Sequence, residues 1–246
     1  MSTDLPVLAI NGLEVRYGAA AAVQGVSLRV SSGVLSVVGR NGMGKTTLCK
    51  TIVGLKEAAG GEIKFLGTPL LGKRPDVIHR LGIGYVPQGR RIWPSLTVDE
   101  HLRIPNTPAF PKWTRERIYE TFPRLAERRN NGGNALSGGE KQMLAIGRAL
   151  LGDPRLVIMD EPTEGLAPVI VDQMVELLRR LASDEGMTIL LVEQNLKVAL
   201  SVADHVAIMV NGAVDRIVGA QELRADRALQ QQLLGVGKQA TRELTA

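Results

Sequence analysis

Apolar residues in the first part of the chain stand in short runs, a pattern that predicts β-strands. Three such runs, "PVLAI", "LEVRYG" and "VSLRV", fall within the first 30 residues. Asn11-Gly12 separates the first two runs, and this dipeptide in that position predicts a hairpin turn. The run "VLSVV" at 34–38 predicts a short buried strand, which is followed by a glycine-rich stretch and an expected helix over "KTTLCKTIVGL".

The pattern changes between about 88 and 135, where prolines recur between helical segments such as "RERIYETFPRLAERR". We expect an inserted, mostly helical lobe there. Beyond it, an expected helix at about 138–151 leads to the strand "RLVIMD", a helix at about 168–185 and the strand "TILLV". Strands that alternate with helices predict a parallel sheet. A hairpin at Asn211-Gly212, and a tail that is helical from about 221 and then polar, complete the expected order.

The composition is that of a globular protein, since 44% of the residues are apolar. The apolar runs are too short to cross a bilayer, no signal segment opens the chain, and the lone Cys49 suits a reducing cytosol. We therefore expect a soluble, cytoplasmic protein. The net charge of +5 fits ordinary solubility as well as contact with lipid headgroups, nucleotides or nucleic acid. Three Phe, three Tyr and two Trp are too few for base stacking, so we expect no nucleic-acid partner.

A phosphate-binding loop is predicted by "GRNGMGKTT" at 39–47, which fits the pattern G-x-x-x-x-G-K-[ST] between an expected strand and an expected helix. Glycines let the backbone N–H groups and the helix dipole face a phosphate. Lys45 is expected to reach the β- and γ-phosphates, and the Thr46 hydroxyl to bind Mg²⁺. The residues expected to bind ATP here are Gly39, Asn41, Gly42, Gly44, Lys45, Thr46 and Thr47.

Two acidic residues end the apolar strand "LVIMDE" at 156–161, at the edge where α/β sheets bind ligands. We expect Asp160 to hold Mg²⁺, usually through water, and Glu161 to polarise the attacking water as the catalytic base. By themselves, two acids at this place could simply end a strand. Together with the phosphate-binding loop, they favour the catalytic interpretation.

The stretch "LSGGE" places two glycines at the start of an expected helix, where glycine costs roughly 1 kcal/mol against alanine. A capping box accounts for Ser137 and Glu140 and leaves the glycines unexplained. Without side chains, Gly138 and Gly139 leave the N–H groups and the positive helix end open to an anion. Ser137, Gly138 and Gly139 are therefore expected to contact a nucleotide held by a second chain, in a head-to-tail pair.

The four motifs "GRNGMGKTT", "VPQGR", "LSGGEKQMLAIGRAL" and "LVIMDEPTEGLAP", in this order, resemble the ATP-binding subunit of ABC transporters over nearly the whole chain. "VPQGRRIWPSLTVDEHL", "EPTEGLAP" and "LLVEQN" are similar to the subunits of branched-chain amino-acid and related amide importers. The resemblance implies an α/β P-loop NTPase core with a mixed, mainly parallel sheet, an N-terminal antiparallel β subdomain and an inserted helical subdomain. It implies one domain over 1–246, with 1–87 and 152–246 as the nucleotide-binding core and 88–151 as the helical signature subdomain.

The resemblance also implies roles for single residues. Tyr17 would stack on adenine, and Gln88 would contact Mg²⁺ and the attacking water. Arg90, Arg91 and Trp93 would lie near the cytoplasmic coupling helix of a membrane subunit, although a solvated basic loop would have the same composition.

Two positions depart from the family pattern. Gln194 stands where most members have a histidine that contacts the γ-phosphate; a glutamine can donate a hydrogen bond there but carries no charge. Ala167 stands in place of the usual aspartate of the loop after the catalytic glutamate, so coupling across the dimer would use Glu164 or backbone groups. We expect that hydrolysis persists and depends on Glu161. The histidines of the chain, none of them at the γ-phosphate position, are His79, His101 and His205.

The expected function is that of an ATPase that powers an importer of branched-chain amino acids or related amides, with ATP and Mg²⁺ as cofactors. Its expected partners are a second ATP-binding subunit, identical or related, and transmembrane permease subunits, which would hold it on the inner face of the cell membrane. Three alternatives stay open: another cargo such as urea, an aromatic acid or an exported lipid; a soluble ABC-type ATPase, for example in iron–sulfur cluster assembly; and a lone P-loop kinase.

Overall fold

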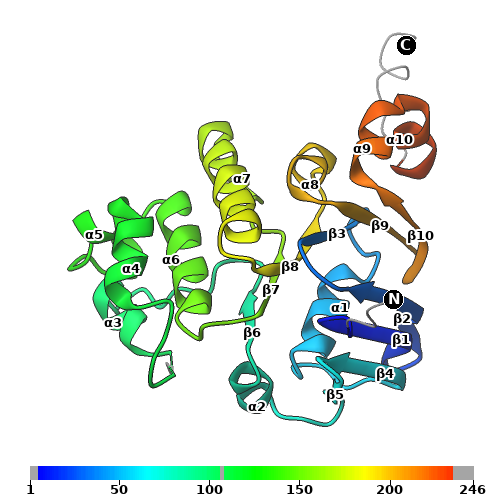
Figure 1. Ribbon diagram of the computed structural model, residues 1–246, viewed down its shortest axis with the longest axis horizontal. Coiled ribbons are helices and arrows are strands. Elements are labelled where there is room, and N and C mark those ends of the chain that lie inside the picture. The colour runs from blue at the N-terminus through cyan, green and yellow to red at the C-terminus, as the bar shows by residue number, and fades with distance from the viewer. Residues whose placement is uncertain (1–4, 106–107, 235–246) are drawn as a thin grey trace.

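A twisted antiparallel sheet is formed by the N-terminal strands in the computed structural model, which describes residues 5–105 and 108–234 (Figure 1). All its strand pairs are antiparallel. This confirms the predicted N-terminal antiparallel β region. In spatial order its strands are β2 (Ala20–Val30), β1 (Leu8–Tyr17), β4 (Gly60–Phe65) and β5 (Thr68–Pro69).

The hairpin predicted at Asn11-Gly12 is wrong. β1 runs through both residues without turning, and the chain turns instead after Tyr17. Gly12 has a φ of +55°, and the pairing of β1 with β2 shifts between Ile10 and Leu13, which describes a β-bulge. The second neighbour of β1 accounts for the difference, because β4 pairs with Asn11 and extends the strand past the local turn signal.

A mixed sheet of six strands forms the centre of the protein. Five of its strands are mutually parallel, and β10 pairs antiparallel with β9 across the predicted Asn211-Gly212 turn. The mainly parallel sheet is therefore confirmed. In spatial order the strands are β10 (Ala213–Gly219), β9 (His205–Val210), β3 (Val34–Val38), β8 (Thr188–Glu193), β7 (Leu156–Asp160) and β6 (Ile83–Val86).

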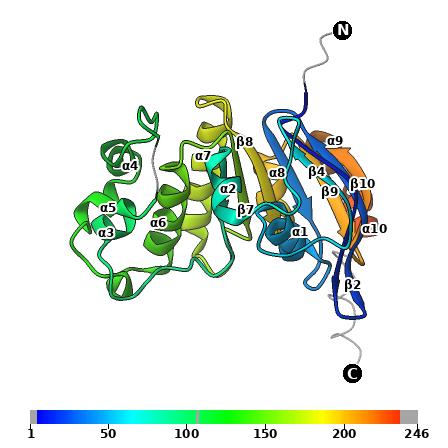
Figure 2. The same ribbon diagram turned by 90° about the horizontal axis from the view of Figure 1, so that it is seen from below.

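The two faces of this sheet belong to different hydrophobic cores. Along β7, Leu156 and Ile158 join the core that contains the antiparallel sheet and Leu48 of α1, whereas Val157 and Met159 join the core that contains α6 and α7. This alternation follows from the two-residue period of a strand. It places α1 (Lys45–Ile52) between the two sheets, and α6 (Gly138–Leu150) and α7 (Pro168–Ser183) on the opposite face (Figures 1 and 2).

Short helices fill the segment between β6 and β7 and lie together at one end of the molecule with α6 (Figures 1 and 2). They are α3 (Val98–Arg103), α4 (Arg115–Thr121), α5 (Pro123–Glu127) and the 3₁₀-helix Gly133–Ala135. The expected helical content of this insertion is thus confirmed. The remaining helices are α2 (Pro75–Arg80), α8 (Leu196–Val202), α9 (Ala220–Ala225) and α10 (Arg227–Leu234). The polar tail at 235–246 lies outside the described residues.

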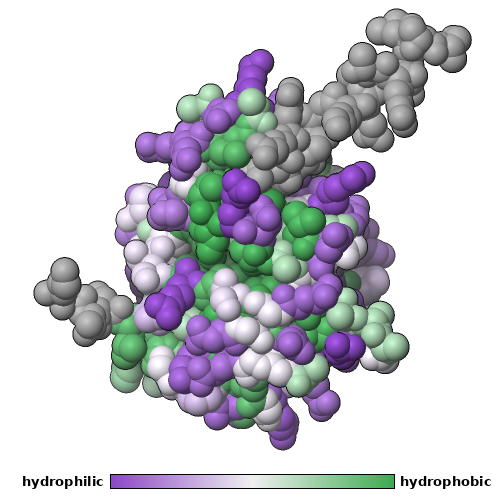
Figure 3. All heavy atoms as spheres, turned by 90° about the vertical axis from the view of Figure 1, so that its right-hand side faces the viewer, coloured by the Kyte–Doolittle hydropathy of each residue, from purple (hydrophilic) through white to green (hydrophobic). Residues whose placement is uncertain are grey.

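Among residues 5–105 and 108–234, none of the helices combines the length and the apolar character needed to cross a bilayer. On the side of the molecule where β10 lies, apolar side chains gather near the upper centre of the view and are bordered by polar ones (Figure 3), and Ile217 of β10 is one of the exposed apolar residues.

Candidate active site

The loop at the carboxyl end of β3 passes close to two neighbouring strands. A methyl group on Gly39 would lie 2.5 Å from the Met209 carbonyl oxygen of β9, and one on Gly44 would overlap the Ala22 carbonyl oxygen of β2. Gly44 also has a φ of +93°, which L side chains rarely adopt. Glycine is therefore required at both positions by the packing of the loop, and this packing aims the start of α1 into a small pocket.

Lys45 joins this loop to the end of β7. Its Nζ donates to the carbonyl oxygens of Gly39, at 2.9 Å, and Arg40, at 3.1 Å. The same nitrogen forms an ion pair with Glu161 Oε1 at 3.1 Å, and both side chains are almost fully buried. The lysine side chain is thus held at the mouth of the phosphate-binding loop by three oxygen partners.

The carboxylate of Asp160 is buried at the end of β7 and only half of it is paired. Oδ1 accepts a hydrogen bond from Thr46 Oγ1 at 3.1 Å, while Oδ2 accepts none within the described residues. Burial is the main cause that raises the Asp160 pKa to about 6; the Thr46 hydrogen bond opposes it, and the negative charge of Glu161 adds to it. A buried oxygen that lacks a partner, beside a hydroxyl, fits Mg²⁺, which takes a few protein oxygens and keeps water and phosphate ligands.

Glu161 sits at a sharp turn directly after β7. Its φ is +50°, and its N–H donates to the Val192 carbonyl oxygen of β8 at 2.8 Å. Gln88, which follows β6, donates from Nε2 to Glu161 Oε2 at 3.2 Å and to Glu164 Oε2 at 2.9 Å. A left-handed backbone at a residue other than glycine is uncommon and often marks a functional site.

A pocket of about 300 Å³ brings together most of the side chains predicted from the sequence. Gly39, Tyr17 and Asp160 do not line it, although the Asp160 carboxylate is bonded to Thr46 of the lining. Gly39 is packed against β9, and Tyr17 lies half-exposed at the end of β1 with Lys56 Nζ 4.5 Å from the centre of its ring. The lining consists of Ala22, Asn41, Gly42, Met43, Gly44, Lys45, Thr46, Thr47, Gln88 and Glu161.

The start of α6 has the predicted capping box. Ser137 Oγ accepts from the N–H of Glu140, and the Glu140 carboxylate accepts from the N–H of Ser137 at 2.7 Å. The two glycines differ, however. A methyl group on Gly139 would lie 3.0 Å from the Ile170 side chain of α7, whereas one on Gly138 would lie 3.5 Å from the Arg90 guanidinium at the surface. Packing therefore accounts for Gly139, and Gly138 alone leaves the helix end open.

Residues 137–139 do not belong to the pocket of the phosphate-binding loop. The capping-box helix α6 and the loop helix α1 lie on opposite faces of the central sheet (Figures 1 and 2). The same chain therefore presents two separate surfaces with features of phosphate binding.

A sequence profile described as ABC transporter matches residues 23–164, more than half of the chain.

The chain belongs to the ABC transporter family.

Curated relatives agree with this assignment. The chain is 40% identical over 212 residues to the high-affinity branched-chain amino acid transport ATP-binding protein BraG of Pseudomonas aeruginosa, an alignment that covers 85% of this chain and 91% of that protein. It is 34% identical to the probable branched-chain amino acid transport ATP-binding protein LivF of Archaeoglobus fulgidus, with coverages of 83% and 88%. The aliphatic sulfonates import ATP-binding protein SsuB of Pseudomonas entomophila is 36% identical, with coverages of 84% and 74%.

Solved ABC cassettes share the fold. A nucleotide-free ATP-binding cassette from an ABC transporter superimposes with a TM-score of 0.79 at 26% identity, covering 92% of this chain and 98% of that one. The ADP conformation of an ATP-binding cassette of an ABC transporter gives a TM-score of 0.77 at the same identity and the same coverages. As a member of this family, the chain is an ATPase.

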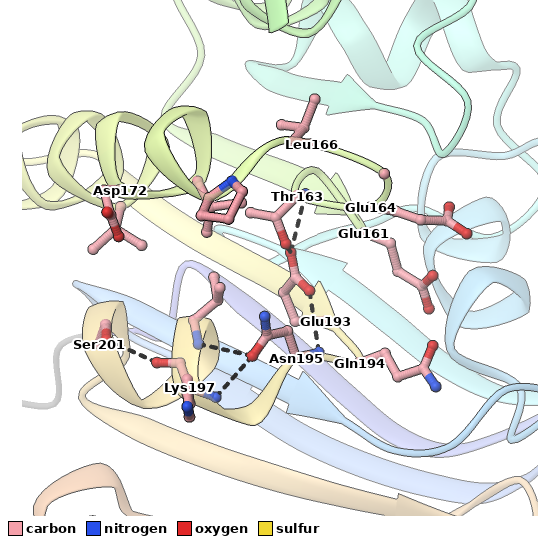
Figure 4. Close-up of a pocket in the computed structure, with 15 residues that line it drawn as sticks. Glu161, Thr163, Glu164, Leu166, Asp172, Glu193, Gln194, Asn195, Lys197 and Ser201 are labelled. Carbon is pink, nitrogen blue, oxygen red and sulfur yellow. Dashed lines mark hydrogen bonds between the residues drawn. The ribbon is translucent and has the colours of Figure 1, made fainter. Parts of the chain in front are cut away.

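Gln194 of this ABC ATPase lies in a second pocket, of about 610 Å³, between α7 and α8. Glu161 contributes to the lining of this pocket as well as to that of the first. Figure 4 shows the side chains of Gln194, Glu161 and Glu164 extending toward the same side. The structure thus places the predicted histidine substitute beside the predicted catalytic base.

Glu193, which was not predicted from the sequence, is a buried carboxylate that lines this second pocket. Its Oε1 accepts from the Thr163 N–H at 3.2 Å and from the Thr163 hydroxyl at 2.7 Å. Burial raises its pKa, and these hydrogen bonds oppose the rise. The signal that drew attention to Asp160, an acid at the end of an apolar strand, is equally present in "TILLVE".

Replacing Gly139 by valine should lower the free energy of unfolding by about 1–3 kcal/mol, because the new side chain would overpack against Ile170. Gly138→Ala should leave stability unchanged or slightly higher, since that position is open and alanine favours a helix. Chemical denaturation of the two variants beside the wild type measures the difference. Equal effects at the two glycines would contradict the packing argument.

Replacing Thr46 by valine should destabilise the protein by about 1–3 kcal/mol, because the buried Asp160 carboxylate would lose the hydrogen bond from the hydroxyl. Thr46→Ser keeps the hydroxyl and should stay close to the wild type. Denaturation without nucleotide tests the bond, and titration of ATPase activity with Mg²⁺ should show a higher half-saturating concentration for the valine variant alone. Valine and serine variants that behave alike would contradict this account of the site.

Proposed function

We propose that this ABC ATPase hydrolyses ATP between two cassettes packed head to tail and that this reaction drives an importer of branched-chain amino acids or related amides. The observation that carries the proposal is the separation of the two phosphate-binding surfaces, since residues 137–139 do not line the pocket around Lys45. One chain therefore holds half of each composite site, and a second, identical or related, chain supplies the other half.

Different residues of one chain bind the phosphates, hold the metal ion and take the proton from water. Lys45 and the loop around Gly42 bind the triphosphate, and Thr46, Asp160 and Gln88 hold Mg²⁺, which supplies a positive charge that offsets the phosphates. Glu161 accepts a proton from the attacking water, and Gln88, hydrogen-bonded to it, orients that water.

Two further residues outside the phosphate-binding loop contact the nucleotide. Gln194 donates its amide N–H to the γ-phosphate in place of the family histidine, since its side chain extends to the same side as that of Glu161 (Figure 4). Tyr17 stacks on adenine with the ring face that Lys56 leaves uncovered. The segments 1–87 and 152–246 thus serve as the nucleotide-binding core.

The helical subdomain at 88–151 contributes Ser137, Gly138 and Gly139 to the nucleotide of the partner chain. The capping box satisfies the Ser137 and Glu140 N–H groups and fixes the direction of the helix start. Gly138 leaves that helix start accessible, and the Arg90 guanidinium lies beside it. Both features suit an incoming phosphate.

A groove of about 610 Å³, whose lining includes residues of α2 and β6, suits a cytoplasmic segment of a permease. Its lining contains Tyr85 and Trp93 together with four cationic side chains and no acidic one. Arg148 stacks on Trp93 at 4.6 Å, and its buried Nε has no partner within the described residues. The permease segment that binds here therefore carries an acidic side chain, which would pair with these cations. The four cations are Lys50, Arg90, Arg91 and Arg148.

The two relatives whose names state branched-chain amino acid transport support the cargo and hence a place on the cytoplasmic face of the membrane. A relative named for aliphatic sulfonates shows that similar cassettes serve other cargoes. Co-expression with candidate permeases, followed by fractionation, discriminates the proposal from a soluble role in cluster assembly. Membrane association that depends on the permease supports transport.

Replacing Glu161 by glutamine should lower the rate of ATP hydrolysis by about 10²–10⁴-fold, because the amide cannot accept the proton of the attacking water. ATP binding should persist, because the triphosphate gives Lys45 the negative charge that Glu161 no longer supplies, so the variant should accumulate as an ATP-bound dimer. Steady-state ATPase assays and size-exclusion chromatography with and without ATP measure the two effects. Unchanged turnover would overturn the role of Glu161, and a variant that stays monomeric with ATP would overturn the head-to-tail pair.

Replacing Arg148 by alanine should weaken the affinity for the permease about tenfold, because it removes a desolvated charge and the cation that stacks on Trp93. Arg124→Ala is the matched control, since Arg124 is exposed and pairs with Glu127 on α5, outside the groove. Pull-down of the permease complex with each variant measures the effect. Equal retention of both variants would contradict the docking site.

A further inference from the structure

Glu193 is a buried charge without a counter-charge. The residue is 2 % exposed, and within residues 5–105 and 108–234 no cationic side chain forms an ion pair with it. Burying a carboxylate costs several kcal/mol unless donors compensate for the lost water. An apolar side chain would end the strand "TILLV" at lower cost, so the carboxylate needs an explanation in what it contacts.

The donors to Glu193 come from two different loops (Figure 4). Oε1 accepts both the N–H and the hydroxyl of Thr163, and Oε2 accepts the N–H of Asn195 at 3.4 Å. Thr163 follows Glu161 by two residues in the loop that leads to α7. Asn195 follows Gln194 and caps α8, where its Oδ1 accepts from the N–H of Lys197 at 3.1 Å. The two oxygens of one carboxylate thus tie these loops together.

We propose that Glu193 is a positioning residue that keeps the loop of the catalytic base and the turn of Gln194 in one fixed arrangement. This inference rests on the proposed function, in which Gln194 contacts the γ-phosphate and Glu161 takes the proton. A displacement of Gln194 is passed through Asn195, Glu193 and Thr163 to the loop at 163–167. That loop lines the same pocket as Gln194, so contact with the γ-phosphate and the placement of this loop change together.

The substitution Glu193→Gln tests the link with little change of shape. A glutamine accepts with one atom only, so an N–H of its amide faces either the Asn195 N–H or the Thr163 N–H, whichever way the amide is turned. The substitution therefore removes the hydrogen bonding to either Thr163 or Asn195 and keeps the volume of the side chain. We expect kcat for ATP to fall about tenfold, and the KM and the equilibrium affinity for ATP to change less than about twofold, because the residue does not touch the nucleotide loop.

Substitutions at Thr163 test the other side of the link. Thr163→Val removes the hydroxyl and should lower kcat in the same way, whereas Thr163→Ser keeps the hydroxyl and should restore it. The double variant Glu193→Gln with Thr163→Val should lose less than the product of the two single losses, because both act on one connection. Glu185→Gln is the matched control. It removes a carboxylate that pairs with Lys112 and Arg117 outside both pockets and should leave kcat unchanged.

The measurements are ATPase kinetics, ATP affinity and unfolding temperature for the full-length chain and each variant. A fall in kcat with preserved ATP affinity and unfolding temperature supports the positioning role. An unchanged kcat in Glu193→Gln, or a parallel fall of kcat, ATP affinity and unfolding temperature, would overturn it, since the latter is the result of a purely structural role. Failure of the Glu161→Gln variant to dimerise with ATP would overturn the proposed pair of cassettes instead, and leaves the kinetic comparison at Glu193 valid.

Discussion

The buried ion pair between Lys45 and Glu161 is the interaction on which the rest of the site depends. It joins the loop after β3 to the turn after β7, two segments more than 100 residues apart in sequence. Breaking a buried pair by removing one partner leaves an uncompensated charge, which typically costs about 3–5 kcal/mol. The hydrogen bond from Thr46, the residue after Lys45, to Asp160, the residue before Glu161, joins the same two segments. The phosphate-binding loop and the two acids at the end of β7 are therefore held in one frame.

This frame follows from the order of the strands. β3, β8, β7 and β6 are adjacent and parallel, so their carboxyl ends meet at one edge and deliver the phosphate-binding loop, Gln194, the two acids and Gln88 to neighbouring positions. The alternation of side chains along the same strands divides α1 from α6 by a full sheet. A single chain built in this way does not bring Gly138 to its own Lys45, which is the structural reason for the two-chain site proposed above.

Local patterns predicted the parts of the site that depend on local chemistry. The loop around Lys45, the acids Asp160 and Glu161, and the capping box of Ser137 and Glu140 each lie within a few residues of sequence, and the structure shows them in the expected local geometry. Several features depend instead on tertiary partners that a local pattern does not contain. Gly12 lies in a bulge, and not in a turn, because β1 also pairs with β4. Gly139 has no room for a side chain because Ile170 of α7 packs against it, and Tyr17 is contacted by Lys56. Glu193 lies within the quoted stretch "LLVEQN", but its role was missed because its donors Thr163 and Asn195 are tertiary partners that the stretch does not reveal.

The balance of charge around Glu161, the proposed catalytic base, supports a requirement for a divalent cation. Three carboxyl groups lie at the ends of β7 and β8, namely Asp160, Glu161 and Glu193, and the exposed Glu164 follows in the loop after β7, whereas Lys45 is a buried cation paired with Glu161. Burial already raises the pKa of Asp160 and of Glu193, so a negative charge is disfavoured at both positions. A triphosphate brought to this edge would add negative charge beside these carboxylates. A divalent ion at the unpaired Asp160 oxygen would offset that charge, so the binding of nucleotide and of metal are expected to be coupled.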